Sequence, residues 1–214
     1  MTVVKLTASK RVKGRFYVDF ESGETLKVTD SLISEFGLAP ERELTGDEFF
    51  ELRELTVKAN AKSRALRILG AKMRSSGELK RRLIELGESE ETAGEVCEWC
   101  ADMGLIDDAE YARQVISDYA SRGYGMRKIR DELYRRRVPR ELWDELLEEA
   151  EDLEDAAGRA LEFINKKLRG GAPDLDDTRK ISAALGRRGF LWDDINTAFS
   201  LYADADFEDS DFYG

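Results

Sequence analysis

Beyond residue 60 the chain repeats itself with a period of about 50 residues. The segments 78–87, 128–137 and 180–189 align without a gap, and their starts lie 50 and then 52 residues apart. Two sets of apolar side chains fall in register, Leu79, Ile129 and Ile181, and Leu83, Leu133 and Leu185. A repeat of this length is typical of arrays in which each unit buries its apolar stripes within itself and against its neighbours. The sequence therefore predicts a series of similar small units.

Each repeat has the pattern of three helices. In the first repeat, a helical apolar pattern ends at the run Ser75-Ser76-Gly77. We expect Ser76 to cap the second helix and Gly87 to end it, with the third helix running from about residue 89 to 103. In the second repeat, Pro139 stands where the third helix begins, a position at which its missing N–H costs nothing.

The first 58 residues follow a different pattern. Apolar side chains alternate with polar ones on both sides of the turn signal Ser22-Gly23, at Phe16, Val18 and Phe20 before it and at Leu26 and Val28 after it. This alternation predicts a β-hairpin, and Val4 and Leu6 allow a third short strand. We expect Asp30 to cap a short helix through Phe36, and a second helix to lead from about Thr45 into the repeats.

The predicted fold is mostly α: tandem three-helix units forming an extended curved chain, with a small N-terminal β-hairpin and helix extension. The expected divisions are the extension at 1–58, repeats at 59–106, 107–151 and 152–203, and an acidic tail at 204–214.

Composition excludes much chemistry. The chain has no histidine, which removes His-based catalysis and His-ligated zinc. Cys97 and Cys100 lie within a helical pattern, and we expect them to pack in a core. The longest run without a charged residue is nine residues, far short of the roughly 20 that a membrane span needs. The first residues contain no apolar signal core, so we expect a cytoplasmic protein.

Charge is segregated along the chain, although the formal net charge is −11. Residues 53–86 carry ten basic and three acidic side chains, and residues 122–140 carry eight basic and two acidic ones. Residues 141–155 carry nine acidic side chains and no basic one, and five acids follow from Asp204. Two basic blocks in an acidic chain predict a surface for an anionic or mixed-charge partner, unless they only solvate the helices or pair with the acidic run.

The segment around the second repeat has residues that invite chemical hypotheses. Asp107 and Asp108 stand where they would cap the next helix, and an isolated aspartate pair is a poor metal site. Tyr111 is expected in the core. Gly123 and Gly125 predict a flexible turn before a helix, since a lone G-Y-G is weak evidence for phosphate binding.

The stretches GLIDDAEYA (104–112), RGYGMRKIRDEL (122–133) and ALRILGAKMRSSGELKRRLIELG (65–87) resemble the RecX regulatory family. Members are built from tandem three-helix units and bind RecA recombinase on DNA. The resemblance covers residues 60–150 well, while the third repeat departs from it by the insertion RGGAPDLDDT. It implies a monomeric, non-enzymatic regulator without cofactor or metal, which binds RecA or the groove of its filaments on single-stranded DNA and inhibits it, with weaker or indirect contact to single- or double-stranded DNA.

Arginines of the second helices are the candidate contacts with the filament, because they flank the aligned apolar positions: Arg81, Arg82, Arg127, Arg130, Arg135, Arg136 and Arg137. A stand-alone DNA-binding module or transcriptional regulator is the first alternative, and it predicts strongly salt-dependent binding to bare DNA. The second is a metal-dependent nuclease using Asp107, Asp108, Asp174, Asp176 or Asp177. The acidic tail suggests a further hypothesis, that it masks the basic surface until a partner displaces it.

Overall fold

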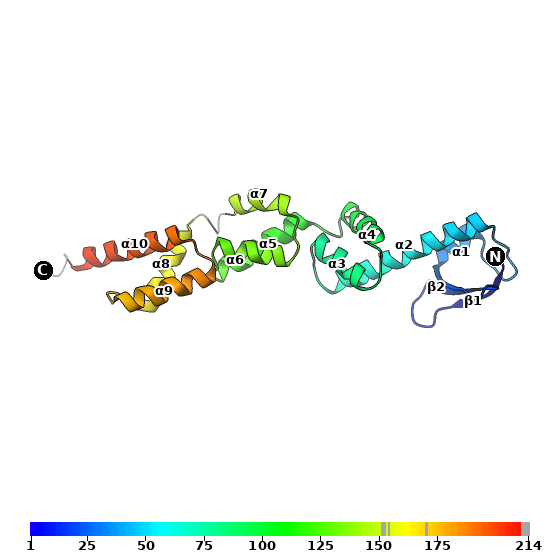
Figure 1. The fold of residues 1–214 in the computed structure, drawn as a ribbon, viewed down its shortest axis with the longest axis horizontal. Helices are drawn as coiled ribbons and strands as arrows, with labels where there is room; N and C mark the ends of the chain where they lie inside the picture. Colours follow the sequence, from blue (N-terminus) through cyan, green and yellow to red (C-terminus); the bar gives the residue numbers. More distant parts are fainter. Residues whose placement is uncertain (151–152, 154, 170, 211–214) are drawn as a thin grey trace. The chain divides into compact units, whose positions relative to one another are not determined.

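The computed structural model describes residues 1–150, 153, 155–169 and 171–210, with side chains described as far as Asp204. The chain forms two compact units. The first comprises Met1–Met73 and Leu79–Ile106, and the second comprises Arg74–Glu78 and the chain from Asp107 onward. The structure is mostly helical with a small N-terminal sheet, as predicted (Figure 1).

The N-terminal sheet has three antiparallel strands in the order β1 (Val3–Ala8), β2 (Arg15–Phe20) and β3 (Thr25–Thr29). The predicted hairpin is therefore confirmed, and the third strand is present. Val18 lies opposite Leu26 on one side and Leu6 on the other.

Two helices cover the sheet. Helix α1 (Asp30–Phe36) is capped by Thr29, one residue before the expected Asp30, because the Thr29 hydroxyl accepts the Leu32 N–H. Helix α2 (Gly46–Ala71) starts at a capping box in which Thr45 and Glu48 satisfy each other's backbone N–H groups.

Helix α2 serves two cores. Its first half packs Leu52 against the sheet, and its second half contributes Ala61 and Ala65 to the first repeat. The expected division after residue 58 thus falls inside one continuous helix. The buried guanidinium of Arg15 in β2 donates to Asn60 Oδ1 at 2.8 Å and to the Ala59 carbonyl at 3.3 Å, which ties the sheet to the middle of α2.

The first repeat adds α3 (Ser76–Glu85) and α4 (Glu90–Asp102) to the end of α2. Ser89 caps α4 as expected, and Gly87 takes a left-handed φ of 95° just after α3. Ser75, not Ser76, accepts the Glu78 N–H at the start of α3, at 3.1 Å. The core also contains both cysteines, which form no disulfide, and burial raises the pKa of the Cys100 thiol.

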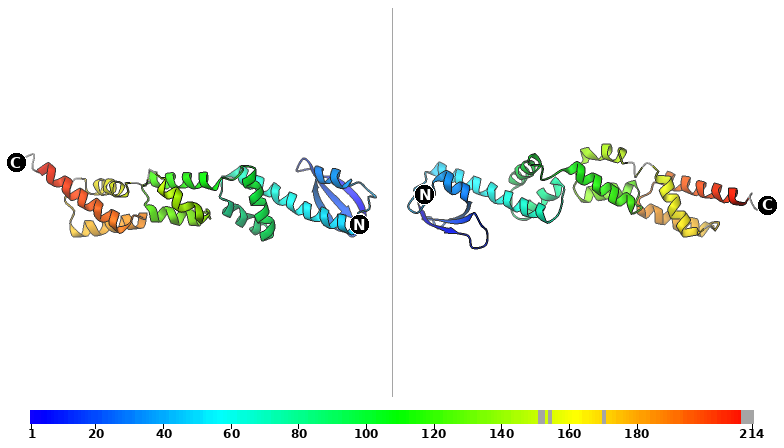
Figure 2. Two further views of the ribbon diagram at one scale, coloured as in Figure 1. Left: turned by 90° about the horizontal axis from the view of Figure 1, so that it is seen from above. Right: turned by 180° about the vertical axis from the view of Figure 1, so that it is seen from behind.

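The second repeat consists of α5 (Asp108–Ser121), α6 (Met126–Arg135), a 3-10 turn (Arg140–Leu142) and α7 (Trp143–Glu148). Pro139 directly precedes the 3-10 turn, and α7 begins only at Trp143, four residues after the position that the sequence predicts for the third helix. Figure 2 shows α5 and α6 side by side in both views. Their buried core contains Tyr111, Ile116, Ile129, Leu133, Trp143 and Leu146.

The third repeat consists of α8 (Ala156–Leu168), α9 (Leu175–Arg188) and α10 (Trp192–Ser210). The aspartates of the insertion RGGAPDLDDT lie at the start of α9: Asp174 caps this helix by accepting the Asp177 N–H at 2.6 Å, and Asp176 and Asp177 are in its first turn. The expected acidic tail starts as the end of α10, and its last four residues lie outside the described residues. No described helix is long and apolar enough to cross a membrane.

Candidate partner-binding surface

Helix α3 carries Arg81 and Arg82 on its exposed side. Leu79 and Leu83 on the opposite side are fully buried, which fixes the orientation of the helix. Both guanidinium groups face Glu85, at 3.6 and 3.0 Å. Exposed ion pairs of this kind contribute only about 0.2–1 kcal/mol, so another anionic group can replace the Glu85 carboxylate at little cost.

Helix α6 presents Arg127 and Arg130 one turn apart, because Ile129 and Leu133 turn the other face of the helix into the core. The Arg130 guanidinium lies 3.1 Å from the Asp144 carboxylate of α7, and both side chains are exposed. Arg127 forms no ion pair with any residue that the structure describes. This face of α6 is therefore open to an anionic partner.

Glu132 on α6 is a buried carboxylate held by two arginines. It accepts hydrogen bonds from Arg135 at 2.6 and 2.8 Å and from Arg136 at 2.5 Å. The Arg135 hydrogen bonds, followed by that of Arg136, hold the pKa of Glu132 down to about 2 against the opposing effect of burial. Arg135 still exposes most of its side chain, whereas Arg136 exposes only 22%.

Arg136 also joins α6 to the neighbouring helices. Its guanidinium donates to the Tyr111 hydroxyl at 2.9 Å, and this hydroxyl donates to the Glu78 carboxylate at 3.2 Å. Tyr111 is buried as expected, and burial raises the pKa of its hydroxyl. Arg136 thus stabilises the protein's own core, and a contact with a partner would be additional to this role.

Arg137 is exposed and has a left-handed φ of 52°. The aligned residues of the other repeats are Gly87 and Gly189, whose φ angles are 95° and 89°. Glycine reaches this conformation without strain, but an L side chain does so at a cost of about 1–2 kcal/mol. An arginine here is therefore unfavourable for the fold, and its exposed side chain is available for binding.

Two hydrogen bonds within the second unit join aligned positions of successive repeats. The Ser75 hydroxyl, at the start of α3, donates to the Arg136 carbonyl at the end of α6, at 2.5 Å. One repeat further on, the N–H of Gly125, aligned with Ser75, donates to the Arg188 carbonyl at 2.9 Å. The contact between Gly125 and Arg188 also brings the N-terminus of α6, with its partial positive charge, to the C-terminus of α9, with its partial negative charge. Gly125 therefore provides a close helix contact, in addition to the expected turn.

The aspartates considered for metal binding have structural partners. Asp107 caps α5 by accepting the Glu110 N–H at 2.8 Å, as predicted. Asp108 accepts the N–H and the hydroxyl of Ser76 at 2.8 and 2.5 Å, and so ties α5 to the start of α3. Among the described residues, no group of three or more acidic or cysteine side chains could hold a metal ion.

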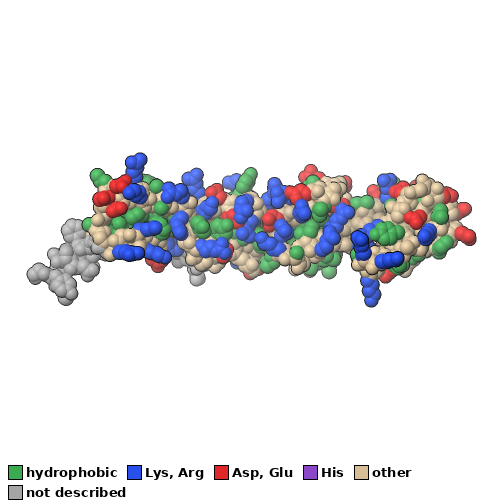
Figure 3. Space-filling model, turned by 90° about the horizontal axis from the view of Figure 1, so that it is seen from below, with side chains coloured by type: hydrophobic (Ala, Val, Ile, Leu, Met, Phe, Trp, Pro, Cys, Tyr) green, Lys and Arg blue, Asp and Glu red, His purple; other side chains and the backbone are tan. Residues whose placement is uncertain are grey.

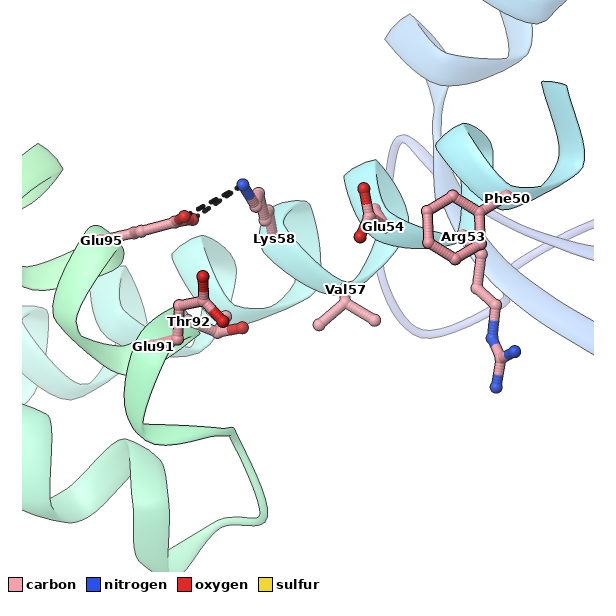
Figure 4. A pocket seen from close by; sticks show the side chains of 8 residues that line it. All are labelled: Phe50, Arg53, Glu54, Val57, Lys58, Glu91, Thr92 and Glu95. Atoms are coloured by element: carbon pink, nitrogen blue, oxygen red, sulfur yellow. Dashed lines mark hydrogen bonds and ion pairs between the residues drawn. The ribbon is translucent and has the colours of Figure 1, made fainter. Parts of the chain in front are cut away.

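A hollow of about 300 Å³ lies between α2 and α4 in the first unit (Figure 4). Lys58 and Glu95 form an ion pair of 2.8 Å across it, and Phe50 and Val57 add exposed apolar surface. The lining of this hollow therefore combines acidic, basic and apolar side chains.

The third repeat has basic residues that the sequence analysis did not select. Arg179 and Arg187 are exposed on α9, and neither forms an ion pair with a described residue. Arg188 instead points inward, donates to the Arg122 and Gly123 carbonyls at 3.2 and 3.1 Å, and lies over the ring of Phe163. Counting charge along the chain missed this surface because acids precede α9 and follow it in sequence.

The two central repeats match known family models. Residues 61–100 match "RecX, first three-helix domain", and residues 107–147 match "RecX, second three-helix domain". The "Regulatory protein RecX" of Pelodictyon phaeoclathratiforme is 35% identical over 138 residues, which is 64% of this chain and 85% of that protein. The protein of the same name from Shigella dysenteriae is 28% identical over 152 residues, 66% of this chain and 90% of that protein.

Solved structures share the fold. A crystal structure of regulatory protein RecX has a TM-score of 0.69 at 24% identity and covers 95% of this chain and 98% of that one. RecX from Lactobacillus salivarius has a TM-score of 0.61 at 19% identity, covering 69% and 97%. With repeats, fold and sequence in agreement, this chain belongs to the RecX family.

Proposed function

We propose that this protein is a cytoplasmic, monomeric regulator that binds RecA recombinase, as monomer or in the groove of its filament on single-stranded DNA, and inhibits its recombinase and ATPase activities in DNA repair and recombination. The observation that carries the proposal is family membership, since the matched segments 61–100 and 107–147 include all seven candidate arginines. A regulator of this kind needs no catalytic residue: preferential binding to one RecA conformation shifts its population.

The proposed contacts are exposed arginines of the second helix in each unit. Arg81, Arg82, Arg127 and Arg130 combine exposure with weak or absent ion pairs, which favours them as contacts. Arg135 and Arg137 are also exposed, while Arg136 contributes mainly through Glu132 and Tyr111.

The test compares binding to RecA filaments, preformed on single-stranded DNA with a non-hydrolysable ATP analogue, with binding to the same DNA alone over a salt series. We expect clear preference for the filament. Arg81→Glu with Arg82→Glu, and separately Arg127→Glu with Arg130→Glu, should each weaken filament binding by about tenfold or more. Lys5→Glu with Lys10→Glu, two exposed residues of the N-terminal region, is the charge-matched control.

Equal or tighter binding to bare DNA would support the alternative of a stand-alone DNA-binding module. Its salt dependence should then be steep, because binding to bare DNA is dominated by release of counterions from phosphates. Loss of filament binding in the Lys5 and Lys10 variant to the same extent would mean that net charge, and not this surface, governs the interaction.

A further inference from the structure

A basic groove runs along α9 in the third repeat. Three hollows of about 590, 410 and 320 Å³ adjoin there, and we call them together the α9 groove. Ala183 lines all three hollows, and two of the three are lined by each of Arg127, Arg179, Gly186 and Arg187. Its floor is low because Ala183 and Gly186 present no bulky side chain. Figure 3 views the face that includes α9 and shows Lys and Arg side chains on both sides of apolar surface there.

The cations of the α9 groove are available. Arg127, Lys128, Arg179 and Arg187 are exposed, and none forms an ion pair with a described residue. Lys180 is neutralised by Asp176 at 2.5 Å, and Asp131 is the other acid in the lining. Arg179 and Arg187 lie two turns apart on α9, about 12 Å along its axis. The groove therefore keeps an excess of positive charge spread along its length.

An aromatic ring stands at the edge of the same groove. Trp192 at the start of α10 is 65% exposed, although a free indole ring on a surface is unfavourable without a partner. Leu175 at the other end of α9 is 92% exposed. A ligand that matches this surface carries anionic groups for the cations and a flat apolar ring for the exposed indole.

We propose that the α9 groove binds a single strand of nucleic acid, with Arg127, Arg179 and Arg187 on its phosphates and the Trp192 indole stacked on an unpaired base. A single strand offers both groups at once, whereas a duplex keeps its bases stacked inside and leaves Trp192 without a partner. An acidic protein segment would pair with the arginines of the groove but would offer no flat ring to stack on the Trp192 indole. The proposal deepens the DNA contact within the proposed function, but it requires no recombinase.

The experiment measures binding of the full chain to fluorescently labelled oligothymidylate by anisotropy over a salt series, with no recombinase present. We expect Arg179→Glu with Arg187→Glu to reduce affinity by about tenfold or more and to lower the salt slope by about 1.4, the value for two lost phosphate contacts on a single strand. Trp192→Ala should reduce affinity by about tenfold, and Trp192→Phe should restore most of it because it keeps a ring for stacking.

The charge-matched control is Lys166→Glu with Lys5→Glu, two exposed lysines outside the groove. A loss in this control equal to that of the groove variant would overturn the proposal, as would equal binding of a matched duplex or of polyglutamate. Circular dichroism confirms that each variant is folded. Arg127 belongs to both surfaces, but the two proposals are tested apart because RecA is absent here and the groove variants change only Arg179, Arg187 and Trp192. A failure of oligothymidylate binding would therefore not contradict filament binding through α3, and a failure of filament binding would not contradict this groove.

Discussion

Gly125 and Gly189 are in backbone contact where α6 meets α9. A Cβ built on Gly125 would overlap the carbonyl group of Gly189, and a Cβ on Gly189 would overlap the backbone of Lys128. The contact belongs to the junction in which the Gly125 N–H donates to the Arg188 carbonyl. Two glycines from different repeats thus permit the close approach that the hydrogen bond requires.

Gly125→Ala should destabilise the protein by about 1–3 kcal/mol, because neither backbone can move away without breaking the junction. Urea unfolding measures the change. Gly94→Ala is the control, since Gly94 lies inside α4 with open space around its Cα and alanine there should stabilise by up to about 1 kcal/mol. Equal effects of the two substitutions would show that the close contact has no energetic importance.

Arg137→Gly should stabilise the fold and weaken filament binding. The left-handed arginine costs about 1–2 kcal/mol, and glycine loses about 0.5–1 kcal/mol of chain entropy, which leaves a gain of about 0.5–1 kcal/mol. Thermal unfolding measures the gain, and filament binding measures the lost cation. If Arg137 contacts no partner, the variant will be more stable with unchanged binding.

Acid should weaken the second repeat through Glu132. Its pKa is about 2 in the folded protein and near its ordinary value of 4.5 in the unfolded chain, so its contribution is complete above that value and is lost as the pH falls towards 2. The shift corresponds to about 3 kcal/mol. Glu132→Gln should remove this pH dependence of the free energy of unfolding, while Asp131→Asn, an exposed neighbour, should retain it.

Truncation after Ala203 tests whether the acidic end of the chain masks basic surface. Removal of five acids should raise affinity for oligothymidylate and for filaments at low salt, and the gain should fade as salt screens the charges. The control retains the length and changes the same acids to Asn or Gln. Unchanged affinity in both would remove the masking hypothesis.

Local features were predictable because they depend on neighbours in the chain. The apolar register of Leu83, Leu133 and Leu185 placed three buried leucines correctly. The caps at Ser75 and Thr29 were missed by one residue, since Ser76 and Asp30 are equally able to cap and only backbone geometry decides between them. The helix predicted from about Thr45 into the repeats is α2, which continues past the expected division after residue 58 because no helix-breaking residue stands there.

Features assembled from distant segments were not predictable in this way. Arg136 belongs to a basic run, and nothing in that run indicates that its guanidinium will donate to the Tyr111 hydroxyl, which in turn donates to Glu78. The α9 groove combines Arg127 with Arg179 and Arg187, which lie more than fifty positions further along the chain. Alignment of the repeats locates the second helices in the sequence, but only the packing of the folded chain decides which of their basic side chains remain exposed.

The double use of α2 has a consequence for how the N-terminal region melts. Arg15 donates hydrogen bonds to Asn60 and Ala59 in the middle of this helix, and these are lost when the sheet separates from α2. Both residues directly precede Ala61, which is buried in the core of the first repeat. Because helix formation is cooperative, unfolding of either core would also unfold the part of α2 that packs in the other core. The sheet and the first repeat should therefore unfold in a single transition, because one helix belongs to both.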